Sequence, residues 1–194
     1  MPSKGGDYVA FNPSEDLNAI QKILIEDIKI LELLDLTGSS MAKRVNDYRK
    51  KNPQSDQQST ETIEKIIKSQ AIIKRSQWND LATNEKRLCI YFIPDRPTRN
   101  EVIMESLFEI DVHVPAVYDY KAWEIQERIK VLLHNTKINK KYTKFYGQLG
   151  ELPTLQGFFC CGSRFRFYRT IWKDVCICNQ LFLVKQEKFY LLNM

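Results

Sequence analysis

The stretch that decides the fold is Ser106–Val114, which reads Ser-Leu-Phe-Glu-Ile-Asp-Val-His-Val. Its apolar side chains recur at every second position: Phe108, Ile110, Val112 and Val114. The polar side chains fill the positions between them: Glu109, Asp111 and His113. A period of two predicts a β-strand with one buried face and one solvated face. Pro115 lacks an amide donor and marks the end of this strand.

The segments on either side predict the elements that pack with this strand. Arg87–Ile93 is an apolar run closed by Pro94, which is typical of a strand covered on both faces. Tyr120–Leu133 carries apolar residues at helical spacing and charged residues elsewhere, which predicts an amphipathic helix. Two strands and one helix therefore form the predicted nucleus of the fold.

The whole chain then predicts an α+β fold. We expect a small, mainly antiparallel β-sheet with one amphipathic helix packed on it, plus a long N-terminal helix and a helical excursion. Residues 1–12 are predicted to be a flexible arm, 13–172 a single domain and 173–194 a C-terminal β extension. The excursion covers residues 41–75 within the domain.

The long N-terminal helix has its own start and stop signals. Asn12 is a suitable N-cap and Pro13 suits the first helical position. The helix is predicted to run to about Leu36, with Gly38 as its stop. Its apolar stripe is wide: Leu17, Ile20, Leu24, Ile28, Leu31 and Leu34, flanked by Ile23, Ile30 and Leu33. Such a stripe fits burial in its own domain, or contact with a neighbouring subunit on its second side.

The remaining segments are predicted from turn residues and alternation. Tyr48–Thr60 has no aliphatic residue and is predicted to be an exposed loop, followed by a helix over Glu61–Arg75. Contact loops are predicted at Pro94–Arg99 and at Lys137–Lys144, the first part of the basic segment Lys137–Gly150. Two hairpins are predicted nearer the C-terminus. The first joins Gly157–Cys161 to Arg164–Trp172 near Gly162-Ser163, and the second joins Val175–Cys178 to Leu181–Val184.

Composition bounds the class of protein. The 194 residues include 43% hydrophobic and 27% charged residues, with a formal net charge of +5, which indicates a mildly basic globular chain. Five cysteines, an odd number, follow a polar N-terminus without a signal-peptide pattern, so we expect buried thiols in a reducing compartment. No apolar stretch has membrane-spanning length, so no membrane partner is expected.

The sequence contains none of the usual catalytic or metal-binding patterns. Cys160-Cys161 are adjacent and Cys176-Ile177-Cys178 is too closely spaced for the usual zinc knuckle, and the chain has only two histidines. With 7 glycines there is no phosphate-binding glycine loop. We therefore expect no metal site, no cofactor and no enzymatic activity.

A metal-dependent nuclease is the enzyme class that comes nearest to the pattern. Such enzymes place Pro-Asp and then acid-x-Lys on neighbouring strands. Here Pro94-Asp95 is followed by Glu109-x-Asp111, so the lysine position carries an acid. The two acids on alternate strand positions are more typical of a solvent-exposed face.

Arg164–Arg169 interleaves arginines with aromatic residues, as base-stacking sheets do. Strand alternation, however, places Phe165 and Phe167 on the face opposite Arg164 and Arg166. A half-buried strand explains the pattern better than a nucleic-acid surface, and a monomeric nucleic-acid-binding module stays as the alternative function.

The order of elements resembles the tail-completion, or head–tail joining, proteins of tailed bacteriophages, the group that includes tail terminators. The resemblance covers Pro13–Ile171 and lies in element order and three short motifs: Asp95–Asn100, Glu109–Pro115 and Arg164–Tyr168. The 41–75 excursion and the segment Lys173–Met194 are additional to the compact members.

The resemblance implies a structural virion protein of the phage neck, made in the host cytoplasm. It implies a ring of copies, with a hexamer expected and a dodecamer as the alternative. The implied partners are the connector or adaptor and the tail tube proteins, and DNA passes through the lumen without specific binding. We expect the polar interface anchors among these residues: Arg96, Arg99, Lys140, Lys141, Arg164 and Arg166.

Overall fold

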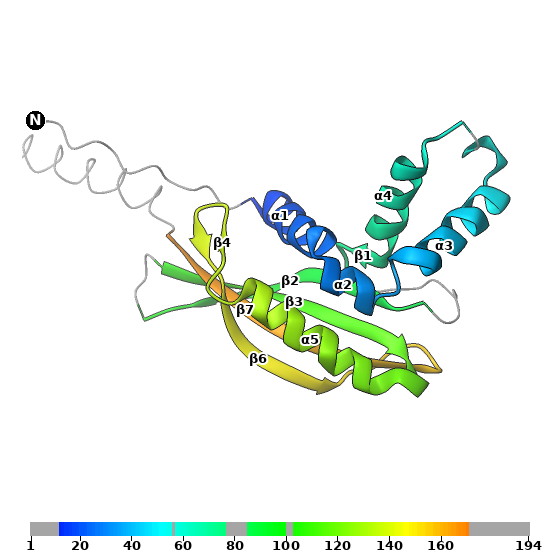
Figure 1. Cartoon of the computed structure of the whole chain (residues 1–194). Helices are drawn as coiled ribbons and strands as arrows, with labels where there is room; N and C mark the ends of the chain where they lie inside the picture. Colours follow the sequence, from blue (N-terminus) through cyan, green and yellow to red (C-terminus); the bar gives the residue numbers. More distant parts are fainter. Residues whose placement is uncertain (1–11, 56, 77–84, 100–102, 171–194) are drawn as a thin grey trace, which may run out of the picture.

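The computed structural model describes residues 12–55, 57–76, 85–99 and 103–170 (Figure 1). Before the first long strand lie α1 (Pro13–Glu26), α2 (Ile28–Leu33), α3 (Gly38–Lys51), η1 (Pro53–Ser55), α4 (Thr60–Ala71) and β1 (Ile72–Ile73). The rest comprises β2 (Arg87–Pro97), β3 (Ile103–Pro115), η2 (Ala116–Tyr118), α5 (Asp119–Leu133), β4 (Lys137–Ile138), β5 (Lys141–Tyr142), β6 (Lys144–Glu151) and β7 (Phe158–Thr170). The predicted arm up to residue 11, the second predicted hairpin and the 173–194 extension lie outside the described residues.

A five-stranded sheet in the order β1-β2-β3-β7-β6 forms the centre of the molecule (Figure 1). All neighbouring strands are antiparallel except the short β1, which runs parallel to β2. The central strand β3 pairs over its whole length with β7, from Ile103 opposite Thr170 to Pro115 opposite Phe158. The predicted mainly antiparallel α+β fold is confirmed.

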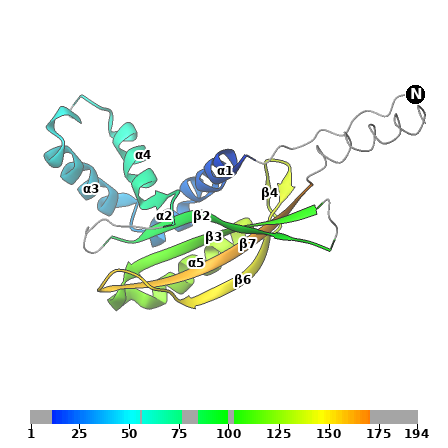
Figure 2. The same ribbon diagram turned by 180° about the vertical axis from the view of Figure 1, so that it is seen from behind.

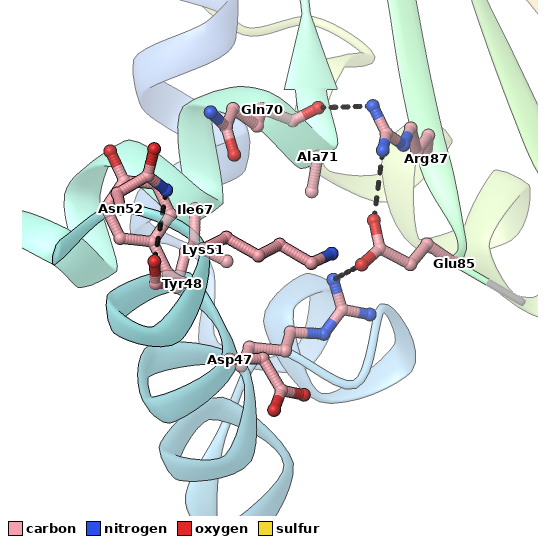
Figure 3. Close-up of a pocket in the computed structure, with 10 residues that line it drawn as sticks. Asp47, Tyr48, Lys51, Asn52, Ile67, Gln70, Ala71, Glu85 and Arg87 are labelled. Atoms are coloured by element: carbon pink, nitrogen blue, oxygen red, sulfur yellow. Dashed lines mark hydrogen bonds and ion pairs between the residues drawn. The ribbon is translucent and has the colours of Figure 1, made fainter. Parts of the chain in front are cut away.

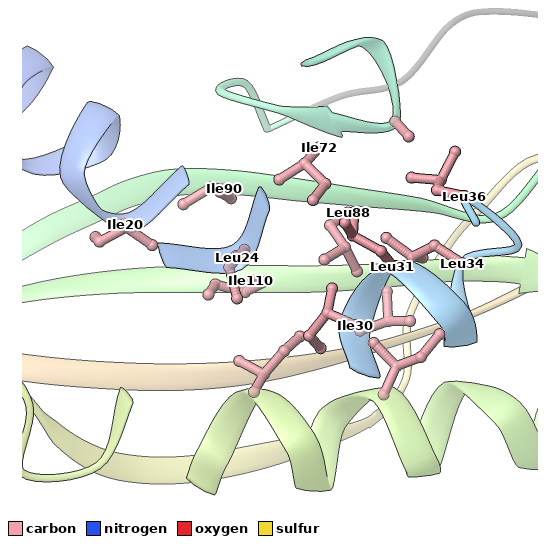
Figure 4. Close-up of a cluster of buried hydrophobic side chains, with 14 of the residues drawn as sticks. Ile20, Leu24, Ile30, Leu31, Leu34, Leu36, Ile72, Leu88, Ile90 and Ile110 are labelled. Carbon is pink, nitrogen blue, oxygen red and sulfur yellow. The ribbon is translucent and has the colours of Figure 1, made fainter. Parts of the chain in front are cut away.

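One face of the sheet carries the hydrophobic core. The apolar residues at alternate positions of β3, which the sequence predicts to be buried, point to this face. They are fully buried, together with Phe165 of β7. Helices α1, α2 and α5 cover them, and Figure 4 shows Ile20, Leu24 and Ile30 from the first two helices meeting Ile90 and Ile110 from the strands. The predicted amphipathic helix is confirmed as α5.

The N-terminal helix is shorter than predicted because Asp27 interrupts it. Asp27 has an extended backbone, and its carboxylate accepts a hydrogen bond from the Ile30 amide at 2.8 Å, so it caps α2. The break rotates the apolar stripe, and Ile28 is 68% exposed instead of buried. Gly38, predicted as the stop, has φ +53° and is the first residue of α3. The predicted cap is correct: Asn12 accepts from the Glu15 amide at 3.3 Å.

The helical excursion is present, with different boundaries. Residues Tyr48–Lys51, predicted as part of an exposed loop, form the last turn of α3, and Ser55 in the following turn is buried. The next helix stops at Ala71, and Ile73, predicted as helical, pairs with Cys89 in the sheet. A β-branched pair, Ile72-Ile73, suits a strand.

The part of the second face around Glu109, Asp111 and His113 is buried, contrary to the prediction from alternation. Glu109, Asp111 and His113 point to this face and are buried at 3%, 6% and 7% exposure. Residues 152–158, which link β6 to β7 and include the first residue of β7, fold back over this part of the sheet. Leu155, for example, packs with Cys89, and Leu152 donates its amide to the Cys160 carbonyl at 2.8 Å. Figure 2 shows this face, which no described helix covers.

The predicted hairpin at Gly162-Ser163 is wrong, because Phe158–Thr170 is one continuous strand paired with β3 and β6. The two contact loops are also largely strands. Pro94–Pro97 extends β2 through a register shift, and the basic segment forms the β4–β5 hairpin and β6. Gly162 marks a close approach between strands, and Pro94 lies in the register shift of β2. Neither residue forms a turn.

None of the helices in the described ranges has the length and apolar character that a membrane crossing requires.

Candidate functional site

Arginines and tyrosines gather on the second face near the start of β3. The Tyr146 hydroxyl of β6 accepts a hydrogen bond from Arg96 of β2 at 2.9 Å, and the Arg96 guanidinium lies 5.7 Å from the Tyr146 ring centre. Arg166 of β7 lies over the same ring at 5.2 Å and over the Tyr168 ring at 5.7 Å. Glu105 accepts from Arg166 at 2.8 Å. We call these five residues the arginine–tyrosine patch.

This patch is accessible and held in place. Tyr146 is 40% exposed and Tyr168 is 47% exposed, so each ring can still be covered by another molecule. Cation–π contacts and the Arg96 hydrogen bond fix the rings before any partner arrives. Tyrosine and arginine are the residue types enriched in binding hot spots, and fixed side chains lose less entropy on binding.

The structure brings together only part of the predicted anchor set. Arg96 and Arg166 belong to the patch, whereas Arg164 lies next to it and bonds Glu109 at 2.6 Å. Arg99 is exposed beyond the end of β2, and Lys140 is exposed at the β4–β5 turn. These two are separate from the patch.

The prediction of Lys141 as an interface anchor is corrected, because the residue is buried and cannot anchor a neighbour. Its ammonium contacts Asp16 of α1 at 2.5 Å, and the side chains of both residues are less than 10% exposed. The same ammonium lies 4.7 Å from the Phe167 ring centre. Lys141 therefore ties the β4–β5 hairpin to α1.

Acids accompany three arginines of β7. Arg164 pairs with Glu109, Arg166 with Glu105, and Arg169 with Asp95 at 2.5 Å. The hydrogen bonds that Arg164 and Arg166 donate to Glu109 and Glu105 raise the pKa of the two guanidinium groups. These matched charges, which we call the charge ladder, reduce the positive surplus that phosphate binding needs.

A second aromatic surface lies at the other end of β3. Four exposed residues follow the strand in η2 and the first turns of α5: Val117, Tyr118, Tyr120 and Trp123. We call them the aromatic end. Glu105 stands near the start of β3 and Pro115 at its finish, so ten residues of strand separate this surface from the arginine–tyrosine patch. At about 3.3 Å per residue the separation is about 33 Å.

A row of polar groups is buried beside the patch. The Tyr91 hydroxyl lies 2.9 Å from Glu109 Oε1 and 2.8 Å from Asp111 Oδ2. A hydroxyl has one hydrogen, so one of the two carboxyl groups must supply the hydrogen of the second contact. Burial raises the pKa of Asp111 to about 7, so a protonated Asp111 can supply that hydrogen.

Next along the row, His113 contacts Cys160 across the β3–β7 pair. His113 Nε2 lies 3.6 Å from Cys160 Sγ, and His113 Nδ1 lies 2.9 Å from Thr154 Oγ1. Burial lowers the pKa of His113 to about 4, so the imidazole is neutral, and burial raises the pKa of the Cys160 thiol. A thiol kept protonated is a poor nucleophile, which argues against cysteine catalysis here.

Asp111, His113 and Cys160 form a group with the chemistry of metal ligands. One possible ligand atom from each lies within 4.8 Å of the other two, and all three residues are buried. The spacing of cysteines in the sequence does not reveal this group, because it contains only one cysteine. The available signal was that the polar positions of Ser106–Val114 and one cysteine of the Cys160-Cys161 pair share a face once those strands pair.

The nuclease pattern is not assembled. Asp95 bonds Arg169, whereas Glu109 and Asp111 meet at the Tyr91 hydroxyl, beside a different part of β2. In the register of the sheet Asp111 is opposite Cys89, and Cys89 precedes Asp95 by six residues on β2. The three acids therefore do not converge on one ion.

A polar cavity of about 320 Å³ lies between α3, α4 and the start of β2 (Figure 3). Glu85 bridges two cations there, contacting Arg87 at 3.0 Å and Arg44 at 3.8 Å. Arg87 also donates to the Gln70 carbonyl at 3.4 Å, and Lys51 points toward Glu85 across the cavity. These contacts join the helical excursion to the sheet.

No family model matches the chain, and no curated protein matches it.

Proposed function

We propose that this chain is a structural virion protein of a tailed-phage neck. Copies of it form a ring, with a hexamer expected and a dodecamer as the alternative, that joins the capsid connector or adaptor to the tail tube. DNA passes through the lumen without specific binding, and the chain performs no catalysis. Two things support this proposal: the family resemblance of the element order, and the distribution of exposed aromatic side chains.

The observation that carries the proposal is the pair of unlike surfaces at opposite ends of β3. A ring needs a heterologous contact, in which one surface of each copy meets a different surface of the next. The arginine–tyrosine patch offers fixed rings and cations, and the aromatic end offers apolar rings that can pack on them. The edge strand β6, which has no second neighbour among the described residues, adds backbone groups beside the patch.

The charge ladder favours assembly over the alternative of a monomeric nucleic-acid-binding module. Arg164, Arg166 and Arg169 of β7 each have an acidic partner within 2.8 Å. Sedimentation with and without DNA separates the two functions. A ring-former self-associates and binds DNA weakly, whereas a monomer whose DNA affinity falls steeply with salt would establish the alternative.

A mixing experiment tests the heterologous contact directly. The variant Tyr146→Ser/Tyr168→Ser removes the rings of the patch, and Val117→Ser/Tyr120→Ser weakens the aromatic end. Each variant alone should sediment as a monomer at concentrations where the wild type forms rings. Their mixture retains one intact pair of surfaces and should therefore form dimers and nothing larger.

Val131→Ser is the matched control, because Val131 is 67% exposed on α5 but belongs to neither surface. It should assemble as the wild type does. The proposal fails if the wild type stays monomeric both alone and with the connector, or if both double variants still form rings. In infected cells, loss of the protein should leave filled heads and tails unjoined, or tails of uncontrolled length, which electron microscopy of particles shows.

A further inference from the structure

We propose that Asp111, His113 and Cys160 form a binding site for a divalent transition-metal ion, and that zinc is the ion the site takes. The inference goes beyond the structural role above and does not depend on ring assembly. The three residues come from two adjacent strands: His113 of β3 is directly opposite Cys160 of β7, and Asp111 precedes His113 by two residues on the same face.

The spacing of the ligand atoms fits a tetrahedral ion. Zinc binds sulfur at about 2.3 Å and imidazole nitrogen at about 2.0 Å, so two such ligands at a tetrahedral angle lie about 3.5 Å apart. The distance between Cys160 Sγ and His113 Nε2 is 3.6 Å. A mixed sulfur, nitrogen and oxygen set suits zinc, whereas magnesium and calcium prefer oxygen alone.

Thr154 orients the histidine as an outer partner does in known metal sites. Its hydroxyl oxygen lies 2.9 Å from His113 Nδ1, on the side of the ring away from Cys160. When Nδ1 donates its hydrogen to that oxygen, Nε2 presents its lone pair toward the sulfur. Thr154 belongs to the segment that folds back over the sheet, so this hydrogen bond links that segment to the site.

An independent observation points to a missing ligand beside Asp111. Its Oδ2 bonds Tyr91, but its Oδ1 is buried and has no hydrogen-bond partner among the described residues. An unpaired buried oxygen costs about 1–3 kcal/mol unless something binds it. Gly162, opposite Asp111, leaves open the space next to this oxygen, and a Cβ there would lie 2.7 Å from it.

Metal bound at this place would cross-link β3 and β7 and hold residues 152–158 against the second face. Three protein ligands leave a fourth position for water. The binding would be structural, because the group is buried and the thiol is not set up for attack. Binding requires the thiolate and the ionised carboxylate, so the ion displaces the protons of Cys160 and Asp111 to solvent.

Zinc and cobalt titrations of the full chain test the site. Protein stripped with a chelator should bind one equivalent of Zn²⁺ in competition with a chromophoric chelator. With Co²⁺ it should show the near-ultraviolet thiolate band and the strong visible bands of a four-coordinate ion. Cys160→Ser should lose the thiolate band. Thr154→Val should keep the band but bind zinc about 10- to 100-fold more weakly.

Two control variants make the result specific. Cys161→Ser removes an equally buried thiol on the opposite face of the same strand and should leave both titrations unchanged. Cys176→Ser/Cys178→Ser removes the other closely spaced cysteines and should also retain the metal. The proposal is overturned if the wild type binds no stoichiometric metal, or if Cys160→Ser keeps the cobalt thiolate band. Unchanged circular dichroism of Thr154→Val ensures that its weaker binding reports on the site.

Discussion

Gly162 of β7 leaves the space that the carboxylate of Asp111 on β3 occupies. A Cβ at Gly162 would lie 2.7 Å from Asp111 Oδ1 and 3.0 Å from a methyl carbon of Leu152. Gly162→Ala should therefore lower the free energy of unfolding by about 1–3 kcal/mol, as overpacking of a fixed site does. Urea denaturation followed by circular dichroism measures the loss.

Gly150→Ala is the matched control for this substitution. Gly150 also lies in the sheet, on β6, but a Cβ there meets nothing within 4 Å. The free energy of unfolding of Gly150→Ala should stay within about 0.5 kcal/mol of that of the wild type. Equal effects of the two substitutions would show that the close approach to Asp111 does not matter.

Neighbouring lysines of the β4–β5 hairpin should behave differently. Lys141→Met leaves Asp16 buried without its cation and should destabilise the chain by about 3–5 kcal/mol. Lys140→Met changes an exposed side chain and should leave stability within about 0.5 kcal/mol. Thermal and urea denaturation of both variants provide the comparison.

A double replacement then separates the lost charge from the lost packing. Asp16→Leu/Lys141→Met removes both charges, so it should be less destabilising than Lys141→Met alone. If the double variant is the least stable of the set, the ion pair itself is the dominant contribution and the penalty for an unpaired buried acid is minor.

The sequence predicts the first face of the sheet well, because that face depends on a local signal. Alternation over Ser106–Val114 and helical spacing over Tyr120–Leu133 each place apolar groups on one side, and both elements form as expected. The second face could not be predicted in the same way. Its cover comes from residues 152–158, and nothing in the alternating stretch itself reports on that segment.

Long-range polar pairs also escape a sequence pattern. Lys141 and Asp16 are 125 positions apart, and an isolated lysine in a basic stretch looks like a surface residue. Asp27 likewise sits inside a helical pattern, and its break follows from a hydrogen bond to the Ile30 amide and a pair with Arg128. The proposed metal ligands are neighbours only because the strand register places Cys160 opposite His113.

The break at Asp27 should contribute to acid sensitivity. The hydrogen bond from Arg128 holds the pKa of Asp27 below its ordinary value. A carboxyl whose pKa is lowered in the folded state stabilises it above the unfolded pKa, and this contribution is lost as pH falls through the folded pKa. Asp27→Asn should therefore be about 1 kcal/mol less stable at neutral pH, and the difference should shrink below about pH 4.

Urea denaturation at a series of pH values measures this difference. Glu26→Gln serves as control, because Glu26 precedes Asp27 and forms only an exposed pair with Lys22 at 3.8 Å. A constant difference between wild type and Asp27→Asn from neutral to acidic pH would show that the carboxylate charge is not the source of the stability.

Glu105 should affect assembly more than folding, because it holds Arg166 within the arginine–tyrosine patch. The Arg166 side chain is 33% exposed and its bond to Glu105 is 2.8 Å long. Glu105→Gln weakens this bond, so Arg166 and the rings beneath it should become less fixed, and assembly would then incur the entropy cost of ordering them. We expect the concentration for half-assembly to rise about tenfold, which corresponds to about 1.4 kcal/mol.

Sedimentation velocity over a concentration series measures this shift, and urea denaturation of the dissociated chain should show little change. Glu127→Gln is the control, since Glu127 forms a similar but exposed pair with Lys130 on α5, away from the patch. If Glu105→Gln assembles at the wild-type concentration while Tyr146→Ser/Tyr168→Ser does not, the rings alone mediate the contact. In that case, fixing them with a charge pair would contribute nothing to assembly.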